Sequence, residues 1–247
     1  NRISLKKKRD KNEVFGIEGV IFSNLENKEV QVYVTNKVAQ GIITELGWDG
    51  NMRSYKPRTG SYSVFSDYLY INEANLGINK ANYFTERKIN HEIDIDNQGS
   101  VREKLTVDFE NQSPSDNWPA GIYRNYLRIY LPKNTVLSSA FTTDLSVAGI
   151  KRQFDSRTIE VFEEHEKTVI GILLEVPVKS SVRLEVNYEL KEKVDLTKKL
   201  NSFLLLVQKQ SGIYSDNYHL NVFLPPDTIP LRVIPKATVS EGRLEIN

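Results

Sequence analysis

Apolar and polar residues alternate most regularly between residues 88 and 109. The first alternating run places four residues on one face: Ile89, His91, Ile93 and Ile95. This period of two is typical of a half-buried strand. A second run of the same kind extends from Val101 to Phe109, and Asn97-Gln98-Gly99 separates the two runs. These three residues suit a hairpin loop in which Gly99 adopts the left-handed conformation, so the pattern predicts a β-hairpin.

The loop also fixes which residues of the hairpin face each other. With Asp96 opposite Ser100, three pairs of opposite charge result: Asp94 with Arg102, Glu92 with Lys104, and Lys88 with Asp108. Each such pair contributes only about 0.2–1 kcal/mol, so the charges select the register and do not hold the fold. Glu103 falls on the apolar face and Glu86 would meet Glu110. We therefore expect the pairing to loosen at the end far from the loop.

The N-terminal part of the chain has a mixed pattern. Residues 29–34 alternate as in a strand, Thr35 is a suitable helix N-cap, and Gly47 is a suitable helix stop. Between them apolar residues recur at helical spacing: Val38, Ala39, Ile42, Ile43 and Leu46. Residues 64–71 then resume a strand. We expect residues 1–83 to form a small α/β segment, the tail of an upstream domain, followed by a connector.

From residue 84 onward short strands dominate. Beyond the hairpin they are expected at 122–131, 135–140, 157–162, 167–176, 181–190, 202–208, 217–224 and 231–234. Many short strands with turn residues about every ten positions predict a mainly β chain, with an Ig-like β-sandwich of antiparallel strands over residues 84–247. Residues 204–207 are apolar on both faces, which predicts a central strand. Residues 191–200 are expected to form a helical turn or a charged crossover.

Composition excludes several classes of function. The chain has 247 residues with 33 basic and 32 acidic side chains, so no strong field points to nucleic acid or to an anionic membrane. The basic run at residues 5–11 is interpreted as a solvated arm or a juxtamembrane spacer, with a binding patch as the alternative. Absence of cysteine excludes disulfides and thiolate metal sites. The chain begins with Asn, carries no signal peptide and has no apolar run near the ~18 residues of a membrane span, so we expect an excised fragment of a longer protein.

Known catalytic and cofactor motifs do not occur. The sequence contains no G-x-S-x-G elbow, no phosphate-binding P-loop and no G-x-G-x-x-G loop. Its three histidines, His91, His165 and His219, are too far apart in sequence for a local metal pair. His165 lies in an acidic run that predicts a hairpin turn between residues 162 and 167. We therefore predict no catalytic residue, no cofactor and no metal ligand.

Two stretches are candidates for binding. Tyr123, Tyr126 and Tyr130, with Arg124 and Arg128, would form an outward aromatic and cationic strip. Such a strip could stack on sugar rings or on a partner protein, and ordinary cross-strand pairing is the alternative interpretation, which we favour.

The second stretch is the asparagine-rich segment 72–82. Asn75, Asn79 and Lys80 surround its single glycine. Asparagine amides satisfy backbone groups in irregular loops, so we expect a buried, hydrogen-bonded connector between the two halves of the chain. A ligand site at Asn75, Asn79 and Lys80 is the alternative.

The same region carries a family resemblance. It comprises the order D-x-L-Y-I-x-x-A-N-L-G-x-N-K-x-x-Y-F-x-x-R at 67–87, N-Q-S-P at 111–114 and W-P-A-G-x-Y-R-N-Y-L-R-I-Y-L-P at 118–132. Together with segments 26–50 and 208–226, these pieces resemble the C-terminal part of the bacterial domain of unknown function 4012 family. The resemblance implies a protein with a single membrane anchor and most of its chain outside the cytoplasmic membrane. It transfers no activity and no catalytic residue.

These observations lead to one leading expectation for function. We expect a non-enzymatic extracellular module, at the cell surface of a bacterium, that binds a surface polysaccharide or an envelope protein. Contact with the membrane would occur only through the upstream anchor. The alternatives are an accessory part of an envelope-polysaccharide enzyme whose catalytic region lies upstream, and a structural stalk that assembles edge to edge.

Overall fold

The computed structural model describes residues 16–53, 63–146, 151–154, 158–213, 217–240 and 242–246. The chain forms two compact units, one of residues 1–52 with 211–214 and one of residues 53–210 with 215–247. This division lies well before the expected boundary near residue 83, because the strand around residue 70 belongs to the second unit. The basic run at 5–11 lies outside the described residues.

The described residues of the first unit form two helices, α1 (Ile17–Glu26) and α2 (Lys37–Leu46). Asn36 caps α2, and its side chain accepts hydrogen bonds from the amides of Val38 and Ala39 at 3.0 and 3.1 Å. The cap is thus one residue later than expected, whereas Gly47 ends the helix with a φ of 76° as predicted. The expected strand at 29–34 is wrong: this segment is irregular, and α1 was not predicted.

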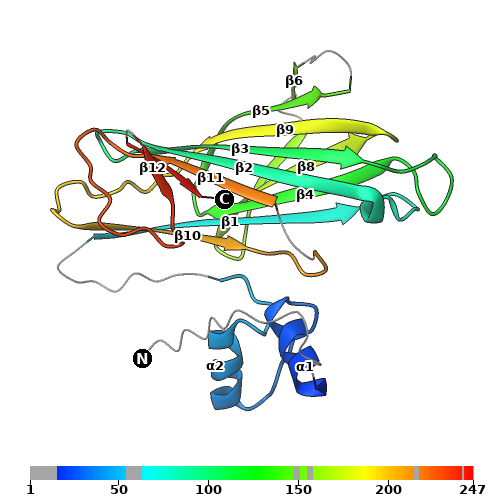
Figure 1. The fold of residues 1–247 in the computed structure, drawn as a ribbon, viewed down its shortest axis with the longest axis horizontal. Coiled ribbons are helices and arrows are strands. Elements are labelled where there is room, and N and C mark those ends of the chain that lie inside the picture. Colours follow the sequence, from blue (N-terminus) through cyan, green and yellow to red (C-terminus); the bar gives the residue numbers. More distant parts are fainter. Residues whose placement is uncertain are drawn as a thin grey trace. The chain divides into compact units, whose positions relative to one another are not determined.

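The second unit is a β-sandwich, and the chain is mainly β as predicted. A five-stranded sheet has the order β10-β1-β4-β8-β7, and an eight-stranded sheet has the order β12-β13-β11-β2-β3-β9-β5-β6 (Figure 1). The elements are β1 (Ser63–Asn75), η1 (Ala81–Phe84), β2 (Thr85–Ile95), β3 (Val101–Asn111), β4 (Tyr123–Pro132), β5 (Val136–Asp144), β6 (Lys151–Gln153), β7 (Ile159–Glu164), β8 (Lys167–Val176), β9 (Ser180–Glu189), β10 (Asn201–Gln208), β11 (Asn217–Phe223), β12 (Thr238–Ser240) and β13 (Arg243–Ile246).

The predicted hairpin is confirmed as β2 and β3. All of the expected pairs are present, among them Asp94 opposite Arg102. Gly99 has a φ of 76°, and an added Cβ there would lie 2.1 Å from the carbonyl oxygen of Val194, so this turn requires glycine. Pairing continues to Thr85 opposite Asn111, so the expected loosening is wrong.

Side chains of the hairpin form ion pairs both within the hairpin and with a neighbouring strand. Glu92 and Lys104 form the expected ion pair at 3.1 Å. Asp108 instead accepts two hydrogen bonds from Arg183 of β9, at 2.6 and 2.7 Å. The charge pattern therefore identified the correct register, although a third strand supplies one of the partners.

Strand direction and strand position differ from the expectation in two places. The β1–β10 and β2–β11 pairs are parallel, so the sheets are mixed and not purely antiparallel. Residues 204–207 lie in β10, an edge strand, and not in a central one. Leu204 and Val207 are 36% and 40% exposed, because apolar residues on both faces of an edge strand are covered only in part. The centre of that sheet is β4.

Several shorter elements complete the comparison with the sequence. The strand expected at 231–234 does not form, and β6, β12 and β13 were not predicted. The turn expected in the acidic run is confirmed: His165 and Glu166 have φ values of 50° and 57° and connect β7 to β8. Residues 191–200 form an irregular crossover from β9 in one sheet to β10 in the other.

The hydrophobic core lies between the two sheets. Alternation along each strand directs one set of side chains inward, where loss of water contact stabilises the sandwich. Large side chains with almost no exposure include Phe109, Tyr123, Leu127, Ile129, Ile170 and Tyr188. The opposite faces of the same strands are free to form surface features.

Candidate functional site

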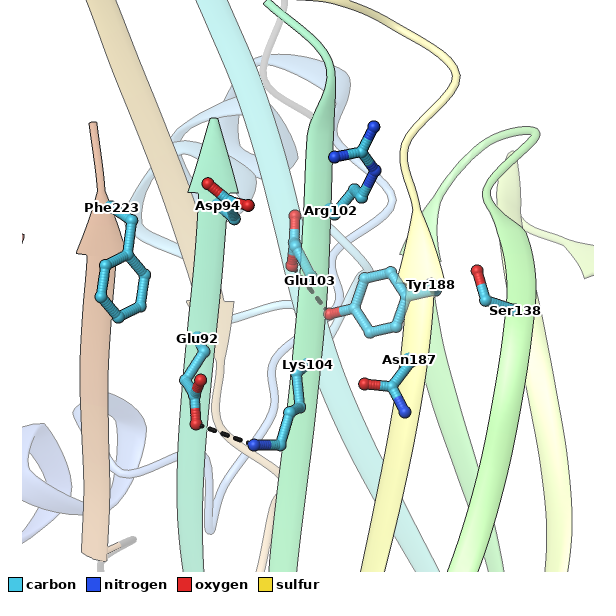
Figure 2. A pocket seen from close by; sticks show the side chains of 9 residues that line it. All are labelled: Glu92, Asp94, Arg102, Glu103, Lys104, Ser138, Asn187, Tyr188 and Phe223. Atoms are coloured by element: carbon cyan, nitrogen blue, oxygen red, sulfur yellow. Dashed lines mark hydrogen bonds and ion pairs between the residues drawn. The ribbon is translucent and has the colours of Figure 1, made fainter. Parts of the chain in front are cut away.

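An open groove of about 510 Å³ crosses the outer face of the eight-stranded sheet (Figure 2). Its lining residues come from β2, β3, β5, β9 and β11: Glu92, Asp94, Arg102, Glu103, Lys104, Ser138, Asn187, Tyr188 and Phe223. The alternation along β2 and β3 explains why charged side chains line the groove. Ile93 and Glu103 face the core, so the residues on either side of each of them in sequence face outward.

The groove presents charges of both signs in weak pairs. Arg102 lies 3.3 Å from Asp96 and 4.0 Å from Glu189, and its side chain is 58% exposed. The pair of Glu92 and Lys104 is about 40% exposed. Exposed pairs of this kind contribute only about 0–1 kcal/mol, so a polar ligand can replace their contacts at little cost.

Uncharged side chains complete the groove. Asn187 donates from Nδ2 to Ser139 Oγ at 3.1 Å. The register of β5 shifts between Leu137 and Ser139, and Ser138, between them, lies exposed at the groove. Phe223, which is 37% exposed, closes the opposite side on β11. The groove thus combines donors, acceptors and one aromatic ring.

A polar cluster occupies the core on the other face of the same strands. Glu103 Oε2 accepts a hydrogen bond from the Tyr188 hydroxyl at 2.8 Å and lies 2.6 Å from His91 Nε2. Nδ1 of His91 lies 2.7 Å from the Tyr218 hydroxyl. These contacts are satisfied together when Nε2 of a neutral imidazole donates to Glu103 and Nδ1 accepts from Tyr218. Asp67 of β1 completes this core cluster from the facing sheet.

The protonation of the core cluster follows from its burial. Burial raises the pKa of Asp67 well above its usual value, and the nearby Glu103 adds to the effect. Burial also raises the pKa of Glu103 to about 7 and lowers the pKa of His91 to about 4. Asp67 Oδ2 and Glu103 Oε1 are both buried without a donor. A proton shared between the two carboxyl groups satisfies both oxygens, and the imidazole stays neutral.

The side chains of the core cluster are almost fully buried. Asp67, His91 and Glu103 are exposed by 3%, 0% and 3%. Among the residues that the structure describes, no three histidine, aspartate or glutamate side chains are arranged to hold a metal ion. Burial of this degree favours a structural role for the cluster, because its side chains offer almost no accessible surface to a substrate.

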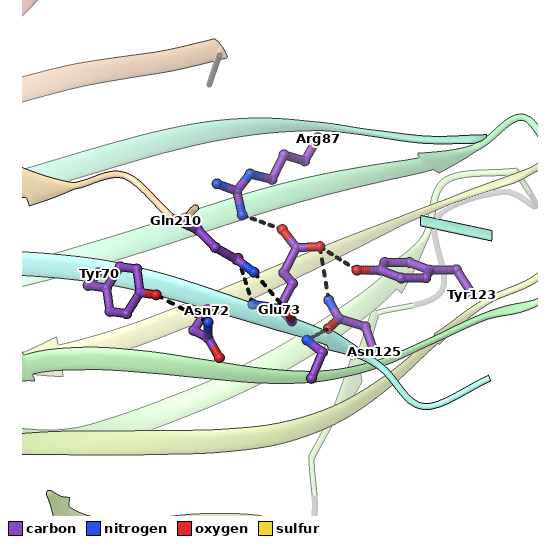
Figure 3. A network of polar contacts seen from close by, with 8 residues as sticks. Tyr70, Asn72, Glu73, Arg87, Tyr123, Asn125 and Gln210 are labelled. Carbon is purple, nitrogen blue, oxygen red and sulfur yellow. Dashed lines mark hydrogen bonds and ion pairs between the residues drawn. The ribbon is translucent and has the colours of Figure 1, made fainter. Parts of the chain in front are cut away.

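A second, partly buried polar network connects the two sheets (Figure 3). Glu73 of β1 forms an ion pair with Arg87 of β2, and their side chains are 13% and 9% exposed. The other carboxylate oxygen of Glu73 accepts hydrogen bonds from Tyr123 at 2.5 Å and from Asn125 at 3.3 Å. Gln210 holds the backbone of Glu73 at 2.9 and 3.0 Å. Here a cationic side chain pairs with the carboxylate.

The predicted aromatic and cationic strip is divided between two faces. Tyr123 points into the core, because it follows the alternation of Leu127 and Ile129. The other four residues share the outer face of the five-stranded sheet, where neighbours bind them: Arg124 with Glu175 (2.7 Å), Tyr126 with Glu160, Arg128 with Asn72 (2.6 Å) and Tyr130 with Glu164 (2.7 Å). These contacts are ordinary cross-strand pairs, and ligand binding by the strip stays a prediction.

The asparagine-rich segment is a hydrogen-bonded connector between β1 and β2. Asn75 donates to the backbone oxygen of Asn79 at 3.1 Å, and Asn79 donates to that of Ile122 at 3.0 Å. The backbone amide of Lys80 donates to Pro119 at 2.6 Å. The segment is partly exposed, in contrast to the buried connector that we expected, and Ile78 at its tip is fully exposed. A ligand at Asn75, Asn79 and Lys80 stays a prediction.

Sequence reasoning missed two parts of this arrangement. Ser138, Asn187 and Phe223 reach the groove through pairings between distant strands, which no local pattern reveals. Asp67 could have been identified, because it alternates with Phe65 and Leu69 on the apolar face of a predicted strand. Neither of the two described helices is long and apolar enough to cross a membrane.

Comparisons with known proteins give only distant similarities. No protein-family model matches the chain, and no curated protein matches it in sequence. It is similar to a candidate protease from Parabacteroides distasonis, with 11% identity, a TM-score of 0.37 and coverage of 66% of this chain and 34% of that protein. A candidate nutrient binding protein from Legionella pneumophila has 11% identity, a TM-score of 0.36 and coverage of 64% and 54%. An M1 zinc metallopeptidase from Deinococcus radiodurans has 9% identity, a TM-score of 0.31 and coverage of 65% and 38%.

The matched part spans between 34% and 54% of the length of these three proteins. Similarity at this level carries no argument about the activity of the chain. Its function has to be argued from the groove and from the buried clusters.

Proposed function

We propose that the chain is a non-enzymatic extracellular binding module of a membrane-anchored bacterial cell-envelope protein, and that its groove binds an extended surface polysaccharide. The groove across the eight-stranded sheet is the observation that supports this proposal. The family resemblance of segments 67–87 and 118–132 supports the location.

The dimensions of the groove suit a chain-like ligand. Its lining residues come from five adjacent strands, from β11 with Phe223 to β5 with Ser138. Strands about 4.8 Å apart make such a floor roughly 19 Å wide, which accommodates several consecutive units of an extended polymer. A polar polymer needs many weak contacts along its length, and the groove offers donors, acceptors and an aromatic ring in sequence.

The chemistry of the groove favours sugars over a charged ligand. Among the exposed lining residues Glu92 and Asp94 offset Arg102 and Lys104, and the third acidic residue, Glu103, is only 3% exposed, so the surface offered to a ligand has no excess of one sign. Hydroxyl groups can donate to the carboxylates and accept from the cations, while an apolar face of a sugar ring can pack on Phe223. Asp67 and Glu103, the two acidic residues whose pKa values are raised, are almost fully buried in the core. Their burial favours a binding role for the chain over catalysis.

A glycan array with the intact chain tests the proposal. Once a polysaccharide is found, Phe223→Ala is expected to weaken its binding about tenfold, equivalent to about 1.4 kcal/mol. Lys88→Met is the matched control, because Lys88 is an exposed lysine of β2 outside the groove. Equal binding by Phe223→Ala and wild type would contradict the role of the groove, as would hydrolysis of the bound polymer by the chain.

A second variant separates the two outer faces. Tyr126 lies on the five-stranded sheet, where it bonds to Glu160. Tyr126→Ala is expected to leave polysaccharide binding unchanged. If only Tyr126→Ala lost polysaccharide binding, the binding site would lie on the tyrosine and arginine strip and not in the groove. If the chain bound an envelope protein and no glycan, the proposed class of ligand would be wrong.

A further inference from the structure

A small pocket of about 120 Å³ lies at the five-stranded sheet, apart from the groove. Its lining residues are Arg53, Ser66, Asp67, Tyr68, Pro132, Lys133, Lys167 and Leu206. It shares no residue with the groove lining on the other sheet. Both the side chains and the volume distinguish it from the proposed polysaccharide site.

Three cationic side chains line the pocket: Arg53, Lys133 and Lys167. The one carboxyl group of the lining, Asp67, belongs to the core cluster, where burial raises its pKa and favours the uncharged form. Lys167 is only 7% exposed, and its ammonium group lies 4.5 Å from the centre of the Tyr68 ring. Burial lowers the pKa of Lys167, and the nearby Glu166 opposes this shift. An anion that enters the pocket would meet a positive charge held in place against the Tyr68 ring.

A buried hydroxyl adds a directional contact. Ser66 Oγ is buried and has no hydrogen-bond partner among the described residues. Buried hydroxyl groups are normally bonded, so an orphaned one beside three cations is an unusual feature that calls for an acceptor. An oxygen atom of a bound oxyanion would accept this hydrogen bond.

The floor of the pocket is held in place before any ligand arrives. The Tyr68 hydroxyl donates to Gln208 Oε1 at 2.9 Å, and the backbone amide of Arg53 donates to the same oxygen at 3.1 Å. Lys133 also contacts Glu163 at 3.6 Å, and Glu166 lies near enough to Lys167 to influence its charge. These carboxylates compete with an incoming anion, so the affinity should be modest and sensitive to salt.

We propose that this pocket binds a small oxyanion of the phosphate or sulfate type. The volume equals that of about four water molecules at ~30 Å³ each, which is room for one tetrahedral anion. The cations would neutralise its charge, Ser66 would donate one hydrogen bond, and Leu206 and Pro132 would exclude bulk water. The anion could be free or could be the substituent of a polymer.

Calorimetric titration of the intact chain with inorganic phosphate and with sulfate tests the proposal. Lys167→Met is expected to weaken binding at least tenfold, because a buried charge-assisted contact is lost. Ser66→Ala is expected to weaken it about threefold, since the variant removes one hydrogen-bond donor and keeps the backbone of β1. Lys88→Met, on the other sheet, should bind as wild type does.

The outcomes decide between a site and general surface attraction. Equal binding by wild type, Lys167→Met and Ser66→Ala overturns the proposal, and so does the absence of phosphate and sulfate binding by wild type at low ionic strength. Thermal unfolding checks that Lys167→Met is folded, and Ser66→Ala decides the question if it is not. Phe223→Ala should leave phosphate binding unchanged, so failure here is distinguishable from failure of the polysaccharide proposal.

A second arm identifies the source of the anion. Dimethyl phosphate carries one negative charge and imitates the diester of a polymer, whereas inorganic phosphate imitates the free ion. Tighter binding of dimethyl phosphate supports a polymer-borne group, and tighter binding of inorganic phosphate supports a free ion. Loss of both in Lys167→Met confirms that they use the same pocket.

Discussion

The inner and outer faces of β2, β3 and β9 carry similar residue types with opposite consequences. On the outer face Glu92 and Lys104 form an ion pair that is about 40% exposed. On the inner face His91 and Glu103 lie at most 3% exposed. Water screens the outer charges, so they can exchange partners with a ligand. The inner groups can exist in the core only when a hydrogen bond, a counter-ion or a proton satisfies each of them.

The difference teaches where function can lie in this chain. Perturbed acids beside a histidine and tyrosines are often taken as the mark of an active site. In this protein they face the core, and the accessible chemistry lies on the opposite side of the same strands. Changes on the inner face should therefore alter stability without altering binding, and changes on the outer face should do the reverse.

The largest effect is expected at the ion pair that joins the sheets. Glu73→Ala removes the ion pair with Arg87 together with the acceptor of the Tyr123 and Asn125 hydrogen bonds, which should lower the free energy of unfolding by about 3–5 kcal/mol. Chemical denaturation measures this change. The matched control is Glu175→Ala, which breaks an ion pair with Arg124 that is about half exposed and should cost about 0–1 kcal/mol. Equal losses in the two variants would contradict the contrast between the faces.

A smaller effect is expected when the core cluster loses one donor. Tyr188→Phe removes the hydrogen bond to Glu103 and should lower the free energy of unfolding by about 1–3 kcal/mol. Polysaccharide binding should stay unchanged if the variant is folded. Tyr126→Phe, whose hydroxyl lies at the surface, should cost less than about 0.5 kcal/mol.

The shared proton predicts a pH dependence of stability. The raised pKa values of Asp67 and Glu103 mean that the folded chain holds protons which the unfolded chain releases, so the free energy of unfolding falls as pH rises. His91 acts in the opposite direction, but only below its usual value of 6.5, where the unfolded imidazole gains a proton. From about pH 6.5 to 8 only the two carboxyl groups contribute, so the free energy of unfolding should fall steadily as pH rises over this range.

Asp67→Asn isolates this effect from all other titrating groups. An amide can donate to Glu103 without a shared proton, so the variant should lose stability less steeply over the same pH range. The measurement is urea unfolding at several pH values for wild type and variant. Parallel curves for the two proteins would show that no proton is shared.

The smallest effect on stability is expected in the groove. Arg102→Ala removes exposed contacts and should change the free energy of unfolding by no more than about 0.5 kcal/mol. The same variant should weaken binding of the polysaccharide found on the array. A loss of stability comparable to that of Glu73→Ala would contradict the assignment of Arg102 to a binding surface.

How far the sequence predicted this picture depends on how local each feature is. The hairpin register was predictable because a three-residue loop connects β2 to β3 and charges on one face confirm the pairing. The edge position of β10 was not predictable from the sequence. It follows from a parallel pairing with β1 between residues that are 138 positions apart, such as Ser63 and Asn201. Apolar residues on both faces indicated a central strand, yet tertiary pairing placed them at an edge.

The candidate sites follow the same rule. Alternation alone places His91 and Glu103 on the core face, but only the assembled sandwich brings Asp67 to them from the other sheet. Likewise the alternation places Arg102 and Lys104 outward, and distant strands add Asn187 and Phe223. Tyr123 was assigned to the surface strip although its odd position in the alternation directs it inward. Local pattern determines the face of a residue, and topology determines its neighbours.

The most direct test of this account is a carboxyl ¹³C NMR titration of Asp67 and Glu103. We predict that the pair retains one proton at pH 7, so at least one of the two carboxyl carbons shows no transition near the usual value of about 4. Complete ionisation of both carboxyl groups near pH 4 would contradict the account, because two negative charges would then lie side by side in an almost fully buried core.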